Sequence, residues 1–281
     1  MSTELGLAVR RKSATPSSGT DIRRDSVEVA KLVDIDLCIG CKACEVACKE
    51  WNDLPVDDTS NFGSYQSHED LTPNTWDLMR FKEVELDDGD LAWLIRKDSC
   101  LHCDDPGCLA ACPAPGAVVQ YANGIVNFDE TKCIGCQYCV AGCPFDIPRF
   151  DEKTKKVYKC TLCIDRVSGG LEPACVKSCP TGAIKYGSKA DMVAIATGKV
   201  DKLKARGFDD AMLYDPQGVG GLLATGIFWL RTGRHRPPPE DEAVAEAGRL
   251  GEEGEAVEAP LPGEPTPAGR PQTGPDEDGE S

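Results

Sequence analysis

Aromatic residues are scarce in this chain, because phenylalanine, tryptophan and tyrosine together make up only 6% of its 281 residues. Large aromatic side chains usually bury much of the apolar surface of a core. A chain of this length can fill one large or two small domains. We therefore expect a core of modest size, in which something besides aromatic packing holds the chain together.

The sequence also lacks an apolar segment long enough to cross a bilayer. The run from Val219 to Leu230 has twelve residues and contains three glycines, whereas a membrane-spanning helix needs about 20 apolar residues. We expect this run to be packed core or an interface contact. No apolar stretch follows Arg10 and Arg11, so we expect neither a twin-arginine signal nor a secretory signal peptide.

Basic stripes and nucleotide-binding patterns are missing as well. The lack of a basic stripe excludes nucleic acid as a partner, and the lack of a strand–GxGxxG–helix unit excludes bound NAD or flavin in this chain. The net charge is −16, and 11 of these charges lie in residues 237–281, which hold 13 acidic residues, two arginines and nine of the 20 prolines. Such a composition cannot bury enough apolar surface to fold, so we expect a disordered acidic tail there.

Cysteine, by contrast, is abundant and regularly spaced. Sixteen cysteines form four groups along the chain: Cys38/Cys41/Cys44/Cys48, Cys100/Cys103/Cys108/Cys112, Cys133/Cys136/Cys139/Cys143 and Cys160/Cys163/Cys175/Cys179. The first and third groups have the C-x2-C-x2-C-x3-C spacing of cubane iron–sulfur ligands, and the other two lengthen one gap. Four 4Fe–4S clusters would use every cysteine. The chain is therefore predicted to carry electrons, with clusters replacing part of the hydrophobic core, since metal binding is coupled to folding.

Cysteine has two other common uses, in disulfides and in zinc sites, and the spacing disfavours both. Disulfides are usual in small secreted chains, but here three cysteines fall within seven residues, too close to pair comfortably. Zinc ribbons use two separated C-x2-C pairs, which does not match three cysteines on one short arc. A structural zinc protein or a redox sensor stays the alternative from a different class, and metal analysis separates it from an electron carrier.

The repeated groups predict an α+β fold of two ferredoxin-like modules, of the bacterial type that binds two 4Fe–4S clusters, with one module nested in the other. Proline follows three of the groups and ends the helical turn that carries their last cysteine. The predicted boundaries are 1–27 for a polar, irregular N-terminal extension, 28–187 for the double domain, about 92–150 for its inner module, about 28–60 plus 151–187 for its outer module, 188–236 for a helical and loop extension, and 237–281 for the disordered acidic tail.

Local elements are predicted within these boundaries. The expected strands are Val29–Asp34, Ala92–Lys97, Val126–Phe128, Val157–Lys159 and Ile184–Tyr186. The spacing also predicts a helix over Lys189–Lys204, with Met192, Ile195, Val200 and Leu203 on or near one face.

Residues beside the cysteines carry further expectations. Gly40 and Gly135 lie in segments that must curl tightly around a cluster, which glycine allows because it tolerates positive φ. Ile39 and Ile134 either cover a cluster or belong to the ordinary core. His102 is not expected to be a ligand, because thiolates complete every site.

Three lysines lie next to cysteine ligands in the sequence. Lys42, Lys49 and Lys159 either raise cluster potentials or are solvated surface lysines. The sequence leaves both readings open.

The ligands of each cluster are predicted to come from two cysteine groups. In two-cluster ferredoxins, three cysteines of a run bind one cluster and the fourth binds the other. The predicted ligand sets are a first set of Cys38, Cys41, Cys44 and Cys179, a second set of Cys48, Cys160, Cys163 and Cys175, a third set of Cys100, Cys103, Cys108 and Cys143, and a fourth set of Cys112, Cys133, Cys136 and Cys139. Ligation within each group is the alternative. No residue of the chain is proposed as catalytic.

The layout of the four groups resembles the four-cluster electron-transfer subunits of molybdopterin oxidoreductases. Within that superfamily the chain is similar to the beta (iron–sulfur) subunit of formate dehydrogenase over about residues 28–221. The matching segments are 30–34, 38–53, 102–108, 120–126, 158–163 and 172–177. Membrane-bound members carry a C-terminal transmembrane helix on this subunit, where this chain has its acidic, proline-rich tail.

The resemblance implies a non-catalytic electron-transfer subunit of an oxidoreductase complex in anaerobic respiration. Such a subunit takes electrons one at a time from a catalytic (alpha) subunit that oxidises formate with a molybdenum or tungsten bis-pterin. It passes them to a cytochrome b (gamma) membrane subunit that feeds quinone, or to a soluble acceptor module. The equivalent subunit of a polysulfide, thiosulfate or dimethyl sulfoxide reductase is the nearer alternative. We expect the chain to be cytoplasmic, or peripherally membrane-associated through its partners.

Overall fold

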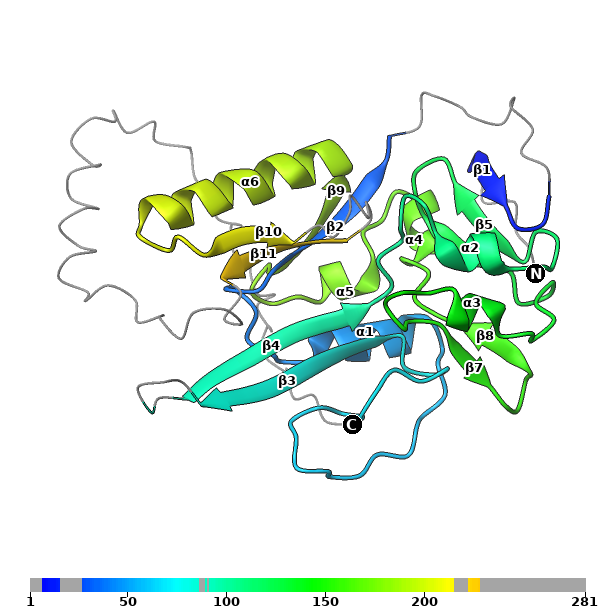
Figure 1. Cartoon of the computed structure of the whole chain (residues 1–281), viewed down its shortest axis with the longest axis horizontal. Helices are drawn as coiled ribbons and strands as arrows, with labels where there is room; N and C mark the ends of the chain where they lie inside the picture. The colour runs from blue at the N-terminus through cyan, green and yellow to red at the C-terminus, as the bar shows by residue number, and fades with distance from the viewer. Residues whose placement is uncertain (1–6, 16–26, 86–88, 90, 215–221, 228–281) are drawn as a thin grey trace, which may run out of the picture. The chain divides into compact units, whose positions relative to one another are not determined.

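A computed structural model of the chain describes residues 7–15, 27–85, 89, 91–214 and 222–227 (Figure 1). Helices and short strands are mixed along these residues, as an α+β fold requires. The helices are α1 (Ala43–Trp51), α2 (Gly107–Ala111), α3 (Tyr138–Ala141), α4 (Ile164–Ser168), α5 (Ala174–Lys177) and α6 (Lys189–Ala205). The predicted tail, 237–281, lies outside the described residues. Among those described, no helix has the length and apolarity needed to cross a membrane.

A four-stranded sheet joins segments that are far apart in the sequence. Its strands lie in the order β10 (Ala211–Tyr214), β11 (Leu222–Ile227), β2 (Val29–Asp34) and β9 (Ile184–Ser188). β2 runs parallel to β11 and antiparallel to β9. β2 has the predicted bounds and β9 begins where predicted. The region 188–236, expected to be helix and loop, therefore also contributes two strands, and β11 falls inside the apolar run that was expected to be packed core or an interface contact.

Helix α6 packs against this sheet (Figure 1). Ser188 caps its first turn by accepting a hydrogen bond from the backbone N–H of Asp191 at 3.1 Å. The predicted helix is confirmed to within one residue, but Ile195 is 46% exposed. Ala196 takes its place in the buried stripe, because it lies four residues after the buried Met192 and so directly above it on the helix.

Three smaller sheets complete the strand structure. They are a three-stranded sheet of β1 (Val9–Lys12), β5 (Val118–Tyr121) and β6 (Val126–Phe128), a hairpin of β3 (Asp77–Glu85) and β4 (Leu91–Ser99), and a hairpin of β7 (Arg149–Asp151) and β8 (Lys156–Tyr158).

Strand β1 corrects the expectation of an irregular N-terminal extension. It pairs with β5, about 110 residues later in the chain. Its Arg11 donates from Nε to the buried Gln120 side chain at 2.8 Å and forms an ion pair with Asp105 at 2.8 Å. The strand forms because these distant partners hold it, and no local sequence signal indicates them.

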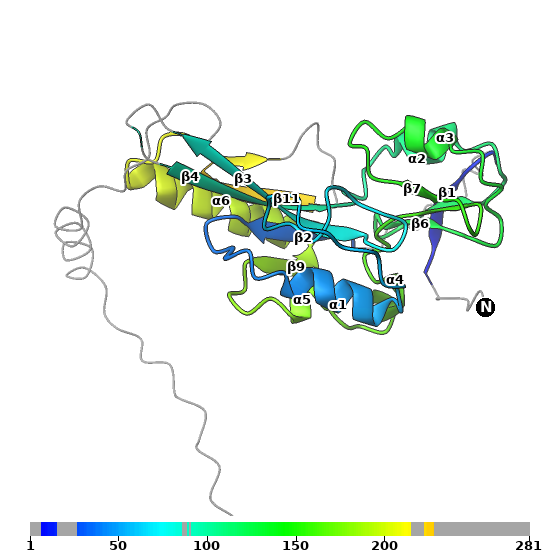
Figure 2. The same cartoon turned by 90° about the horizontal axis from the view of Figure 1, so that it is seen from below.

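The short helices pack in two pairs (Figure 2). Helix α1 contacts α5, which brings the residues around 43–51 next to those around 174–177, and α2 contacts α3. The α2–α3 contact depends on two glycines. A Cβ on Gly107 would lie 2.4 Å from the carbonyl oxygen of Gly142, and a Cβ on Gly142 would lie 2.7 Å from the Cβ of Ala111. Only glycine at both positions allows this approach.

We predict that Gly107→Ala prevents α2 and α3 from reaching their native separation. The variant should lose about 1–3 kcal/mol of stability, as overpacked sites do, and should retain less iron. Gly198→Ala is the matched control, because Gly198 is also helical but has no atom within 4 Å of a built Cβ. That control should be stabilised by roughly 0.5–1 kcal/mol through helix propensity. Thermal unfolding and iron analysis of the two variants measure the difference, and equal stability would contradict the prediction.

Candidate metal centres

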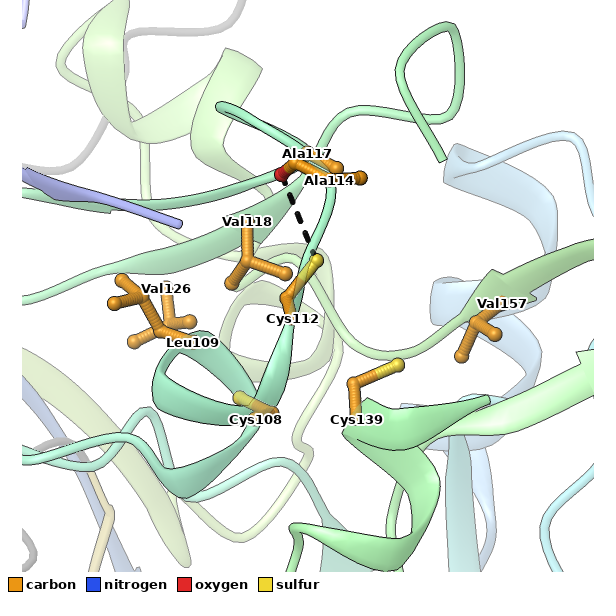
Figure 3. Packing of buried hydrophobic residues seen from close by; sticks show 9 residues of the cluster. All are labelled: Cys108, Leu109, Cys112, Ala114, Ala117, Val118, Val126, Cys139 and Val157. Carbon is orange, nitrogen blue, oxygen red and sulfur yellow. Dashed lines mark hydrogen bonds between the residues drawn. The ribbon is translucent and has the colours of Figure 1, made fainter. Parts of the chain in front are cut away.

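The third and fourth sets each line one cavity, which we call the third and the fourth cavity. Cys100, Cys103, Cys108 and Cys143 line one cavity. Cys112, Cys133, Cys136 and Cys139 line the other. Each cavity therefore takes three cysteines from one sequence group and one from the next group. Apolar side chains close the space around them, including Leu109, Val118, Val126 and Val157 (Figure 3).

The first set also lines a single cavity, which we call the first cavity. Cys38, Cys41 and Cys44 precede or begin α1, and Cys179 follows α5. The α1–α5 contact and the β2–β9 pairing bring these distant parts of the chain together. Pro180, Ala183 and Ile184 line the same cavity. These are residues of the segment that follows the last cysteine.

The second set is the most enclosed, and all four of its cysteines are buried. Cys48 lies on α1 and Cys175 on the neighbouring α5. Burial, followed by the charges of Asp77, Cys160 and Cys175, raises the pKa of the Cys48 thiol well above its ordinary value. Burial, followed by Cys160 and Cys175, likewise raises the pKa of Cys163 to about 12. The four thiols therefore share one buried region.

The same backbone curl recurs two residues after the first cysteine of every group. The φ angle is +64° at Gly40, +49° at His102, +72° at Gly135 and +53° at Leu162. The positive φ expected at the two glycines is confirmed. Its presence at His102 and Leu162 was not foreseen, because residues other than glycine seldom adopt it.

The curl turns backbone N–H groups toward sulfur. His102 donates from its backbone nitrogen to the Sγ of Cys100 at 3.4 Å, and Leu162 donates in the same way to Cys160 at 3.4 Å. Hydrogen bonds to the ligand sulfurs are one of the means by which a protein sets a cluster's potential. His102 thus acts at the site through its backbone, and its imidazole Nδ1 accepts a hydrogen bond from the backbone N–H of Val126 at 3.2 Å.

The electrostatics of the thiols fit a metal cluster. Burial is the main cause that raises the pKa to about 12 for Cys44, Cys103, Cys108, Cys139 and Cys163. A thiol with such a pKa is protonated at neutral pH, so a thiolate there needs a positive partner, which a bound metal supplies. In the part of the chain that the structure describes, no three His, Cys, Asp or Glu side chains are arranged to hold a single ion. Thiols spread around a cavity suit a cluster, whose iron atoms each take a separate ligand.

Each of the four sets lies next to the following one in space, because neighbouring sets share an apolar cluster or a helix. Cys44 of the first set and Cys175 of the second pack in one apolar cluster. Cys48 and Cys160 of the second set pack in another with Cys100 of the third. Helix α2 then carries Cys108 of the third set and leads directly into Cys112 of the fourth. The sets therefore form a continuous series from first to fourth.

Both ends of this series reach the surface. Cys41 of the first set is exposed. Ile39 lines the first cavity and Ile134 the fourth, yet they are 62% and 66% exposed, so neither belongs to the ordinary core. Tyr138, beside the fourth set, is 61% exposed. These apolar side chains cover the two ends of the series.

The three lysines beside cysteines differ in their surroundings. Lys42 is half-buried, with Nζ 5.7 Å from the centre of the Phe81 ring, and Lys49 pairs with Asp57 at 3.3 Å. Lys159 is buried and lines the third cavity, so it is not a surface lysine. Two further buried lysines, Lys31 and Lys97, were missed by sequence reasoning, since neither is adjacent to a cysteine in the sequence.

Comparisons with known proteins agree with these features. Two family models, both described as a 4Fe-4S dicluster domain, match residues 91–189 and 37–116. The formate dehydrogenase-O iron-sulfur subunit of Escherichia coli is 58% identical over 214 residues, which cover 76% of this chain and 71% of that protein. The formate dehydrogenase iron-sulfur subunit of Haemophilus influenzae is 60% identical over 200 residues, or 71% of this chain and 64% of that protein. The formate dehydrogenase 2 subunit beta (cytochrome c-553) of Nitratidesulfovibrio vulgaris is 39% identical over 197 residues, or 68% of this chain and 90% of that protein.

Proposed function

Because the chain belongs to the iron–sulfur (beta) subunits of formate dehydrogenase, we propose that it conducts electrons through four 4Fe–4S clusters, one held by each of the four cysteine sets. It is the non-catalytic electron-transfer subunit of an oxidoreductase complex and works with a separate catalytic subunit. In the proposal, that partner oxidises formate at a molybdenum or tungsten bis-pterin. The electrons leave one at a time for a quinone-linked cytochrome b subunit or a soluble acceptor.

The observation that carries this proposal is the composition of three cavities. Each is lined by three cysteines of one sequence group and one cysteine of another, which is the pattern of crossed ligation in two-cluster ferredoxins. The contacts of α1 with α5 and of α2 with α3 support two modules, with the segment of the second inserted into that of the first. This is the nested arrangement that we propose.

The residues of the chain have three tasks in this function. The sixteen thiolates hold the clusters, which when bound accept and release single electrons. Apolar residues such as Val126, Val157 and Ile184 exclude water from the cavities. Backbone N–H groups, including those of His102 and Leu162, stabilise charge on the ligand sulfurs. The chain needs no acid, base or nucleophile for electron transfer.

Electron paramagnetic resonance of the anaerobically purified native complex tests the proposal. Formate should produce signals of reduced 4Fe–4S clusters, and a sample without the catalytic subunit should show them only with dithionite. Iron and acid-labile sulfide should each be present at about sixteen atoms per chain, since each cubane holds four of both. Clusters that dithionite reduces but formate does not would favour another molybdopterin oxidoreductase. About four zinc ions per chain in place of iron would favour a structural zinc protein.

A further inference from the structure

Three lysine side chains are buried in the part of the chain that holds the cysteine sets. Lys31 on β2 is 0% exposed, Lys97 on β4 is 7% exposed, and Lys159, which directly precedes Cys160, is 4% exposed. Lysine is almost never fully buried unless its ammonium group has a charged partner. Each of these three groups therefore needs a partner of opposite charge.

Lys97 and Lys31 lie where the first set meets the second. Lys97 lines the first cavity, and its Nζ forms an ion pair with Asp77, which lines a separate cavity beside Cys48 of the second set. The Nζ of Lys31 donates to the Ser99 hydroxyl at 3.2 Å, and the ionisable groups that act on it include Lys97, Asp77 and the thiols of Cys175 and Cys160. This location contains two buried ammonium groups, and the buried Glu45, which lines the same cavity as Asp77 and Cys48, is a second carboxylate beside it. Glu45 accepts hydrogen bonds from the backbone N–H of Met79 and the hydroxyl of Ser67, and from neither lysine.

Lys159 lies where the second set meets the third. It lines the third cavity, and its Nζ donates to the carbonyl oxygen of Cys160, a second-set residue, at 3.0 Å. A second bond goes to the carbonyl oxygen of Val126 at 2.6 Å. His102 is also buried, and its Nδ1 accepts a hydrogen bond from the backbone N–H of Val126 at 3.2 Å.

Lys31 and Lys159 are thus the buried lysines without an acidic partner of their own in the described part of the chain, whereas Lys97 is paired with Asp77. Among the residues that the structure describes, no carboxylate lies within ion-pair distance of the Nζ of Lys31 or Lys159. An unpaired buried ammonium group is costly, so a nearby anionic group is required to offset it. A 4Fe–4S core with four thiolates is such a group, because the thiolates outweigh the charge of the core.

We propose that the buried ammonium groups of Lys31, Lys97 and Lys159 raise the reduction potentials of the clusters on either side of them. Asp77 offsets part of this positive charge at the location of Lys31 and Lys97. This inference rests on the proposed function, because it assumes clusters in the four sets. A positive charge favours the reduced, more negative state of a neighbouring cluster. Burial disfavours added negative charge and so makes an enclosed cluster harder to reduce. The lysines offset this effect, so that the second-set and third-set clusters stay reducible by the first-set and fourth-set clusters.

The test uses two substitutions that change the local charge in opposite directions. Lys31→Met removes one positive charge, and Asp77→Asn removes the negative charge that balances Lys97, with little change in shape. Potentials are measured by a redox titration of the native complex monitored by electron paramagnetic resonance. Lys31→Met should lower, and Asp77→Asn should raise, the potentials of the first-set and second-set clusters. We expect at least a tenfold change in the equilibrium constant for reduction, which is 59 mV for a one-electron couple.

Controls separate this charge effect from damage to the fold. Lys202→Met on the exposed side of α6 should leave every potential unchanged, and the fourth-set cluster should be unaffected in all variants. Potentials that do not move, or that move in the same direction in both variants, would overturn the inference. If Lys31→Met fails to assemble, the sign of the Asp77→Asn shift decides. An unmodified complex without iron and sulfide would instead overturn the proposed function itself.

Discussion

Removal of iron and sulfide should unfold the region from Val29 to Gly187. Three of the apolar clusters in this region are built around cysteines, and they include Cys44, Cys108 and Cys160 among their buried members. The helices that carry cysteines of the four groups, α1, α2, α3 and α5, have four to nine residues, too few to be stable alone. Metal binding is therefore a large part of the folding free energy.

Hydrogen–deuterium exchange of the full chain measures this effect before and after anaerobic removal of the clusters. Amides of α1, α2, α3 and α5 should exchange at least about a hundredfold faster, which corresponds to about 2.8 kcal/mol of lost protection. Helix α6 is the internal comparison, because its apolar contacts among the described residues include no cysteine and keep Ala211 and Leu213 as partners outside the region, although Ala30 and Leu32 lie within it. It should lose less protection. Adding iron and sulfide back should restore the pattern, whereas unchanged exchange without clusters would show that the fold does not depend on them.

Paired cysteine substitutions should reveal which cysteines share a cluster. With crossed ligation, Cys103→Ala and Cys143→Ala together remove two ligands from one cluster, because both cysteines line the third cavity. About four iron atoms per chain should be lost and about twelve retained, given four iron atoms per cubane. Ligation within each group predicts damage to two clusters instead, with three-iron signals or a loss of about eight iron atoms.

A second pair of substitutions serves as the matched control, because the two ligation models predict the opposite outcomes for it. Cys139→Ala and Cys143→Ala lie in one sequence group but line different cavities. Crossed ligation predicts two damaged clusters for this pair, whereas ligation within the group predicts the loss of one. Iron analysis and electron paramagnetic resonance of both double variants give the answer. If the second pair lost a single cluster and the first pair damaged two, the proposed ligand sets would be wrong.

Local features of this protein could be predicted well from the sequence. Strand β2 has the bounds expected for it, α6 differs by one residue, and the positive φ at Gly40 and Gly135 is present. In each case the signal lies within a few neighbouring residues, as a spacing, a periodicity or a glycine. The strand β1 and the exposure of Ile195 could not be predicted in this way, because each depends on packing against residues distant in the sequence.

The sequence by itself determined the number and type of the sulfur donors and the family of the chain. Ligand spacing is a local property, because three cysteines within seven residues must face the same small volume. Only the tertiary structure decided which sets are neighbours, which of them reach the surface, and that Lys31, Lys97 and Lys159 are buried among them. The physical reason is that burial and electrostatic environment are set by every segment packed around a group. No pattern along the chain shows that β2 and β4 place their lysines between two cysteine sets.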